Sequence, residues 1–183
     1  SAAQAADAEP ERRFDTDGNA YTWEEFREFY SDSSDSDGVA YAHWNAAKHW
    51  AHKLTKALAA ARSIPELLEL YEDNAQGVNH VHIPTVWHKL GKLSKGGDGR
   101  RQLKRNEGRL HPLREHTVAM LPQLREQGLA NMALGLANAG LVRAPWDELW
   151  NGIGVEARGR LGEFNSQDFA NTVWAFATAK HAS

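Results

Sequence analysis

The amino-acid sequence predicts an all-α protein, in which a short helical N-terminal module precedes an α-solenoid of helix pairs with a period of about 40 residues. Two observations predict this fold class. Apolar residues recur at helical spacing through most of the chain, without a stretch of strand-like alternation. One helix-like segment also recurs 40 residues further on, which is typical of stacked helix pairs.

The N-terminal part is predicted to hold a leader and a module. Residues 1–12 contain few apolar side chains and are expected to form a disordered leader. Residues 13–50 are expected to form a short helical module. Its first helix should follow Thr22, because Thr22 and Glu25 have the spacing of a capping box. A polar linker is predicted at residues 31–38, where Ser, Asp and Gly dominate.

Residues 51–183 are predicted to form the helical-repeat domain. Ser63, with Glu66 three residues later, is expected to begin one helix, and Asn79 is expected to cap the next. The Gly-rich segment 95–99 is predicted to be a loop. Further helices are expected near residues 112–121, 125–139, 145–160 and 166–179, with Gly140 as a helix stop.

An internal repeat supports the solenoid. Residues 127–139 align with residues 167–179 at an offset of 40, with five identical positions that include Gln, Asn and three Ala. A fainter copy at residues 83–93 has an offset of 46. The alternative is that two Ala-rich amphipathic helices resemble each other by chance. The last repeat helix runs almost to residue 183 with no capping helix after it, so we expect a longer natural chain or a truncation.

A polar stripe is the first candidate binding site. The spacing of Gln, Asn and Thr side chains places them on one face of each repeat helix. Helical-repeat proteins that bind RNA present a few such side chains per repeat to an unstacked base. The alternatives are an ordinary solvent-facing surface or a role in tying adjacent repeats together. The stripe consists of Gln127, Asn131, Asn138, Gln167, Asn171 and Thr178.

A basic segment is the second candidate. The net charge of −3 is the sum of −8 over residues 1–37, +7 over residues 88–125 and −2 over the remaining segments. Lys and Arg side chains neutralise phosphates, so a basic middle indicates a polyanionic partner, although a solvated charged face is the simpler alternative. The residues we select are Arg100, Arg101, Lys104 and Arg105, within a wider set that adds Lys89, Lys92, Lys95, Arg109 and Arg114.

Nothing in the sequence indicates catalysis, a cofactor or a membrane span. Cys is absent, which excludes disulfides and thiolate metal sites. The chain contains no Gly-rich phosphate loop, no nucleophile elbow and no zinc-protease motif. The pairs His49/His52 and His80/His82 lack a third ligand at metal spacing. No apolar run reaches the roughly 20 residues of a spanning helix, so a soluble protein is expected.

The segment from Asp15 resembles the start of a calcium-binding EF-hand loop. Such a loop needs Gly at its sixth position and Glu at its twelfth. Here these positions hold Ala20 and Phe26. We therefore interpret Asp15, Asp17 and Asn19 as turn residues before a helix and do not predict a calcium site.

Residues 164–177 have the pattern FxxQxxANxxWAxA. They resemble the signature helix of octotricopeptide-type repeats. These repeats accompany RAP-domain and FAST-kinase-like proteins in organelles. The segments 63–68 and 79–85 resemble the opening of such arrays and the repeat region of RNA-editing substrate-binding-complex proteins. Met132 to Gly135 depart from the usual Trp-containing centre, and no RAP domain is visible. The segment 17–26 is similar to a short module attached to many algal and protist proteins, which we interpret as a docking element.

The resemblance implies an α-solenoid that binds single-stranded organellar RNA, in a chloroplast or a mitochondrion, and acts in transcript processing, stability or translation. We therefore predict an RNA-binding protein and not an enzyme. The alternative is a structural or scaffolding subunit of an organellar assembly such as a ribosome or a photosynthetic complex, because solenoids bind proteins as readily as nucleic acids.

Overall fold

The computed structural model describes residues 12–14, 20–31 and 36–179. This part of the chain is helical apart from one short two-stranded ribbon, which confirms the predicted all-α character. The chain divides into two compact units, residues 1–54 and 55–183. The predicted boundary after residue 50 lies inside a helix, α2 (Ser36–Ala60), because helical spacing continues without a break across it.

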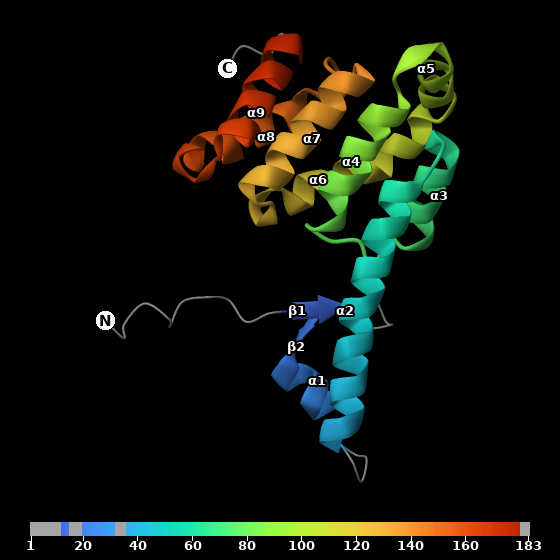
Figure 1. Ribbon diagram of the computed structural model, residues 1–183, viewed down its shortest axis with the longest axis vertical. Coiled ribbons are helices and arrows are strands. Elements are labelled where there is room, and N and C mark those ends of the chain that lie inside the picture. Colours follow the sequence, from blue (N-terminus) through green and yellow to red (C-terminus); the bar gives the residue numbers. More distant parts are fainter. Residues whose placement is uncertain (1–11, 15–19, 32–35, 180–183) are drawn as a thin grey trace. The chain divides into compact units, whose positions relative to one another are not determined.

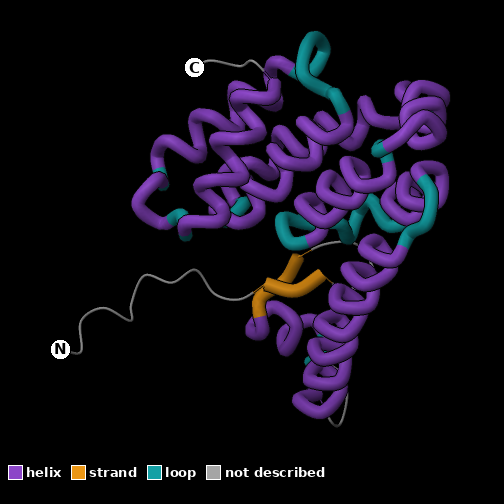
Figure 2. Tube along the Cα trace, turned by 45° about the horizontal axis from the view of Figure 1, so that its top comes forward, coloured by secondary structure: helices purple, strands orange, loops and turns teal. Residues whose placement is uncertain are grey.

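The first unit contains an antiparallel ribbon that the sequence analysis did not predict. Strand β1 (Arg12–Phe14) pairs with β2 (Ala20–Thr22), and Arg13 lies opposite Tyr21 (Figure 2). Each strand has only three residues, which is too short for alternation to show in a sequence. The predicted leader therefore ends before Arg12, and residues 1–11 lie outside the described residues.

Helix α1 (Trp23–Phe29) begins as predicted. The Thr22 hydroxyl accepts a hydrogen bond from the Glu25 amide at 3.2 Å, and the Glu25 carboxylate accepts one from the Thr22 amide at 2.6 Å. The predicted linker 31–38 is too long, because α2 already begins at Ser36. Asp37 in the first turn of α2 favours this start, since a carboxylate is stabilised at the positive end of a helix.

Aromatic side chains form the core of the first unit. Phe26, Trp44 and Ala47 are buried, and the Phe26 and Trp44 rings meet edge to face at 5.3 Å. Arg13 covers the Trp44 ring at 4.0 Å and donates a hydrogen bond to the Trp44 carbonyl at 2.8 Å. The ribbon is thus tied to α2 by a cation–π contact and a hydrogen bond.

The second unit is a layered helical array. Helices α4, α7 and α9 lie side by side in one layer (Figure 1), and α6 and α8 pack against each other in a second layer. Helix α8 also packs on α7, and α3 packs on both α4 and α5. The helices of this unit are α3 (Ile64–Asp73), α4 (His82–Leu93), α5 (Gly96–Arg105), α6 (Leu110–Met120), α7 (Glu126–Ala139), α8 (Asp147–Gly159) and α9 (Ser166–Ala179).

Several predicted helix ends are confirmed. Ser63 caps α3 by accepting a hydrogen bond from the Glu66 amide at 3.3 Å, although Glu66 reaches back to the Arg62 amide and not to Ser63. Gly140 ends α7 in the left-handed conformation, with a φ of 74°. The predicted start of α9 at Ser166 is also correct, and Asn165 accepts a hydrogen bond from the Asp168 amide at 2.8 Å.

Two local predictions are wrong. The segment 95–99 is no loop, because α5 begins at Gly96, where a φ of 82° turns the chain directly out of α4. Asn79 does not cap α4, since the helix begins at His82. The Asn79 side chain instead accepts a hydrogen bond from the Val81 amide at 3.0 Å, which forms a separate turn before the helix.

Helices α4 and α7 approach each other backbone to backbone. A Cβ atom on Gly91 would lie 2.5 Å from the Gly135 carbonyl oxygen, and one on Gly135 would collide with the Trp87 carbonyl. Beside this contact the Trp87 side chain is fully buried. Its indole donates a hydrogen bond to the Thr117 hydroxyl at 2.9 Å and meets the Trp146 ring edge to face at 5.8 Å. Trp87 therefore joins α4 to α6 and to the start of α8.

Replacing Gly135 by Ala is expected to destabilise the protein by about 3 kcal/mol, because the added methyl meets rigid backbone and overpacking of this kind costs about 1–3 kcal/mol. Urea unfolding measures the change. Gly159→Ala is the matched control, since nothing lies within 4 Å of its Cβ position. Equal midpoints for both variants would contradict the close approach of α4 and α7.

Candidate nucleic-acid interface

The polar stripe of α7 lies on the outer side of the helix layer. Gln127 is exposed, and Asn131 and Asn138 are half-buried. The opposite side of α7 forms the core, with Leu129 and Leu136 fully buried. The side facing α4 is formed by Gly128 and Gly135, whose Cβ positions meet Pro84 and Trp87. The three polar side chains thus share the one face of α7 that no neighbouring helix covers.

The stripe of α9 repeats this arrangement. Gln167 and Thr178 are exposed and Asn171 is half-buried. The residues of α9 that are buried lie on another side of the helix, and they are Asp168, Thr172, Ala175 and Ala179. Since α9 packs on α7, these four small or polar residues face α7 and leave the stripe open to solvent.

The stripe amides do not link neighbouring helices by hydrogen bonds among the described residues. Within the part of the chain that the structure describes, Asn131, Asn138 and Asn171 make no hydrogen bond to a neighbouring helix. Gln127 and Gln167 make none either. The alternative role for these side chains, tying adjacent helices together, therefore has no hydrogen bond to support it.

The structure adds side chains to the stripe that the sequence analysis assigned to the core or did not consider. Trp174 is 48% exposed, although it aligns with apolar Leu134 in the repeat. On α4 the corresponding outer positions, 46 residues before those of α7, hold exposed Val81, half-buried Thr85 and exposed Lys92. The signal was present in the spacing, since residue 174 lies three after Asn171 and four before Thr178.

His88 lies at the seam between α4 and α7. Its backbone nitrogen is 2.9 Å from the Cβ position of Gly135, and its side chain is half-buried. The His88 Nδ1 atom is buried without a hydrogen-bond partner. Burial, together with the ammonium groups of Lys92 and Lys95, lowers the pKa of His88 below its ordinary value of 6.5. His88 is therefore a neutral ring at neutral pH.

The four selected cations all lie on α5. Arg100, Arg101, Lys104 and Arg105 are exposed, and Arg101 pairs with Asp98 at 3.2 Å. The other three make no ion pair within the described residues. Helix α5 packs on α3, whereas the stripe lies on α7 and α9, so the two predicted sets occupy different helices.

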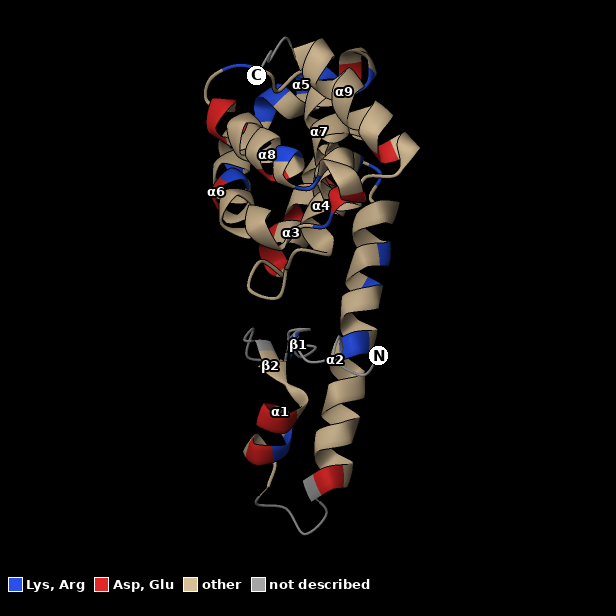
Figure 3. Cartoon of the chain, turned by 90° about the vertical axis from the view of Figure 1, so that its left-hand side faces the viewer, with Lys and Arg blue, Asp and Glu red and all other residues tan. Residues whose placement is uncertain are grey.

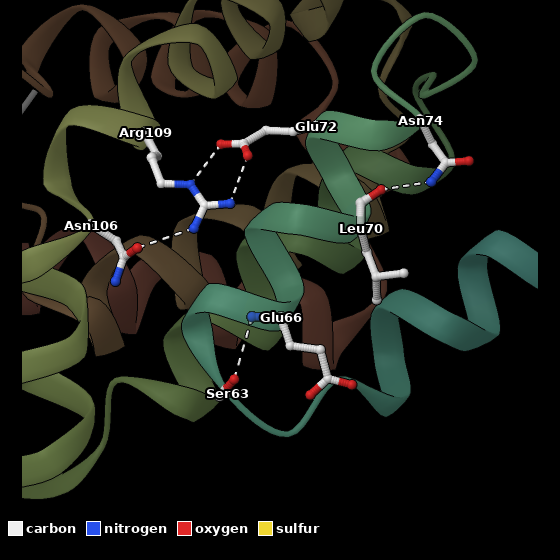
Figure 4. Close-up of polar contacts among 7 residues, drawn as sticks. All are labelled: Ser63, Glu66, Leu70, Glu72, Asn74, Asn106 and Arg109. Atoms are coloured by element: carbon white, nitrogen blue, oxygen red, sulfur yellow. Dashed lines mark hydrogen bonds and ion pairs between the residues drawn. The ribbon is translucent and has the colours of Figure 1, made fainter.

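Two cations of the wider basic segment have structural partners. Arg109 donates two hydrogen bonds to the Glu72 carboxylate, at 2.8 and 2.6 Å, and a third to Asn106 at 3.1 Å (Figure 4). This contact lowers the pKa of Glu72 and raises that of Arg109. Arg114 donates to the Pro145 carbonyl at 2.8 Å. Both side chains therefore join helices and are poorly available to phosphates.

Charge is segregated among the helices of this unit. Helices α7 and α9 carry one charged residue each, Glu126 and Asp168, and are drawn almost entirely in tan in Figure 3. Cations are concentrated on α5 and on the second half of α4, where Lys89 and Lys92 are found, and α6 and α8 carry Arg114 and Arg158. The two stripe helices are thus nearly uncharged, and the selected cations lie on another helix.

The described residues also bear on metal binding and on membrane insertion. No group of three His, Asp or Glu side chains with metal-binding geometry occurs in the described part of the chain. Residues 15–19, which contain the EF-hand-like acidic residues, lie outside it. No described helix is long and apolar enough to span a membrane. The chain matches no protein-family model and no solved structure.

His116 makes stability depend on pH. Burial lowers its pKa below 6.5, and its Nδ1 lies 3.1 Å from the Tyr71 hydroxyl, whose own pKa burial raises to about 12. The unfolded chain therefore binds a proton more readily than the native protein. The stabilising effect of neutral His116 is present above about pH 6.5 and is lost as the pH falls through the lowered pKa.

We expect the urea midpoint to decrease when the pH is lowered from 7.5 to 5.5. The decrease should be smaller in His116→Gln, because the Gln side chain cannot titrate but can still hydrogen-bond to Tyr71. The lowered pKa values of His80 and His88 act in the same direction and the same pH range in both proteins, and so does the lowered pKa of Glu72 at more acidic pH. An unchanged pH dependence in the variant would show that His116 is not the group responsible.

Proposed function

We propose that this protein binds single-stranded RNA on the outer face of α4, α7 and α9, as an α-solenoid with a repeat of about 40 residues. The observation that carries the proposal is that polar side chains occupy equivalent positions on neighbouring helices of this face. Asn131 and Asn171 occupy equivalent positions on helices that pack side by side, and Thr85 is their counterpart on α4. Each helix can thus offer hydrogen-bonding groups to one unstacked base, as helical-repeat RNA-binding proteins do.

Three helix pairs make up the proposed repeats: α3 with α4, α6 with α7, and α8 with α9. The offset of 46 between the first two copies exceeds the later 40 because α5 is inserted between α4 and α6. Together with the resemblance to octotricopeptide-type repeats, this organisation supports a role on chloroplast or mitochondrial transcripts, in their processing, stability or translation.

The cations of α5 should supply the salt-dependent part of binding. Neutralising Arg100, Arg101, Lys104 and Arg105 to Gln is expected to weaken RNA binding and to reduce the slope of log affinity against log salt by up to about 3, since each phosphate contact to a single strand contributes about 0.7. Fluorescence anisotropy at several salt concentrations measures both. The matched control neutralises four exposed cations elsewhere, namely Lys48, Lys53, Lys56 and Arg62. Equal losses of RNA affinity in the two variants would show that the overall net charge, and not the position of the α5 cations, causes the loss.

The stripe amides should supply the salt-independent part. The double variant Asn131→Ala/Asn171→Ala is expected to lose roughly tenfold in affinity with an unchanged salt slope, because hydrogen bonds to bases release no counterions. Asn151→Ala, at an exposed position of α8, is the control and should bind like the original protein. A loss of affinity no larger than that of Asn151→Ala would contradict the role of the stripe amides in binding.

A scaffolding role in an organellar protein assembly is the second candidate. The observation that favours it is exposed apolar surface on α9, where Phe169 is 48% and Val173 51% exposed. The equivalent residues of α7, Leu129 and Ala133, are fully buried. Co-purification of a fixed protein complex after nuclease treatment would favour this role over RNA binding.

A further inference from the structure

Trp174 stands at the centre of the outer face of α9. It lies three residues after Asn171 and four before Thr178, so helical geometry places these three side chains next to one another. Its indole is 48% exposed, which is unusual for the largest apolar side chain. A flat exposed ring is therefore bordered by an amide on one side and a hydroxyl on the other.

The chemistry around Trp174 limits what α9 can bind. The one charged residue of α9 is Asp168, which is buried. An RNA strand that crosses this helix therefore meets no cation of α9 to neutralise its phosphates. The interactions that α9 can offer are hydrogen bonds and ring stacking, and stacking on an aromatic side chain is the stronger of the two, since every nucleobase has a π-face.

Trp174 adjoins both the stripe and the apolar side of α9. Phe169 has the same exposed fraction, 48%, on the same helix. A separation of five residues corresponds to a rotation of about 140° around the helix axis. Exposed Ala170, Val173 and Ala177 occupy the arc between the two rings. Phe169 therefore lies away from the stripe, whereas Trp174 lies next to Asn171.

We propose that Trp174 is a base-stacking residue: an unstacked base of single-stranded RNA lies on its indole, and Asn171 and Thr178 hydrogen-bond to the edge of that base. The inference rests on the proposed RNA-binding function and identifies one binding position within it. The chemical class of ligand is an unpaired nucleotide, because bases within a duplex have no free face for the indole.

The test uses the full chain and two fluorescent probes, a uridine oligomer of about 12 nucleotides and an abasic oligomer with the same sugar–phosphate backbone. Trp174→Leu restores the residue that α7 has at the equivalent position, so the fold should tolerate it. Its affinity for the uridine oligomer is expected to fall roughly 5- to 100-fold, the range observed for stacking contacts, and its affinity for the abasic oligomer should stay the same. Trp174→Phe should retain most of the binding.

The control variant is Phe169→Leu, which removes an equally exposed ring from the other side of α9 and should leave both affinities unchanged. Equal losses for Trp174→Leu and Phe169→Leu, or equal losses on both probes, would overturn the stacking role. Thermal unfolding of each variant shows whether a loss of affinity is caused by misfolding. If Trp174→Leu is misfolded, the affinities of Trp174→Phe test the stacking role instead. If the original protein binds neither probe, the proposed RNA-binding function itself fails. If it binds both and Trp174→Leu binds as it does, only the stacking role fails.

Discussion

The direct backbone contact between α4 and α7 is the constraint on which the candidate interface depends. Side chains normally hold two helices 8–10 Å apart and leave some freedom in their relative translation. Here Gly91 and Gly135 remove the side chains at the crossing point, so the two backbones meet and Trp87 is enclosed beside them. A shift of either helix along its axis would drive a side chain into the backbone of the other. The outer positions of α4 and α7 are thereby fixed at matching heights.

The contact between α7 and α9 has a different composition but the same effect. Its α9 side is formed by Asp168, Thr172, Ala175 and Ala179. The Thr172 hydroxyl donates a hydrogen bond to the Asp168 carbonyl at 2.8 Å. Small and internally satisfied side chains allow close packing without leaving buried polar groups unpaired. Because both contacts use the flanks of the helices, the outer face remains available on all three. The proposed binding face and the packing contacts therefore lie on different sides of the same helices.

Much of this could be predicted from the sequence, and what could not has identifiable reasons. The repeat in α7 and α9 was found because polar residues recurred together with apolar ones, and Thr22, Ser63 and Gly140 act locally, within one turn of the chain. The ribbon escaped prediction because its strands are too short to show alternation. Helix α5 escaped because its Gly-rich start suggests a loop.

The candidate site shows the same division between local and tertiary information. Helical spacing alone placed Asn131 and Asn138 on one face of α7. It could not show that Arg109 is held by Glu72, since these residues belong to segments far apart in the chain. Nor could it show that Trp174 is exposed, because a large apolar residue is normally buried in a helical protein. Which side of α9 remains uncovered is a property of the packed array and is not encoded in the spacing of α9 itself.

Helix packing also determines what kind of nucleic acid this face could bind. Even helices whose backbones meet stay farther apart than about 4.6 Å, twice the radius of about 2.3 Å of their Cα cylinders, whereas stacked bases follow one another about every 3.4 Å along a strand. Side chains on neighbouring helices therefore cannot contact consecutive bases of a stacked strand. They can contact consecutive bases only if the strand is extended and its bases are separated from one another, which costs stacking energy. In the proposed complex, the exposed indole of Trp174 on α9 would restore part of that energy. A face with amides alone would bind such an extended strand less favourably, so the proposed ligand needs this ring as well as the hydrogen-bonding groups.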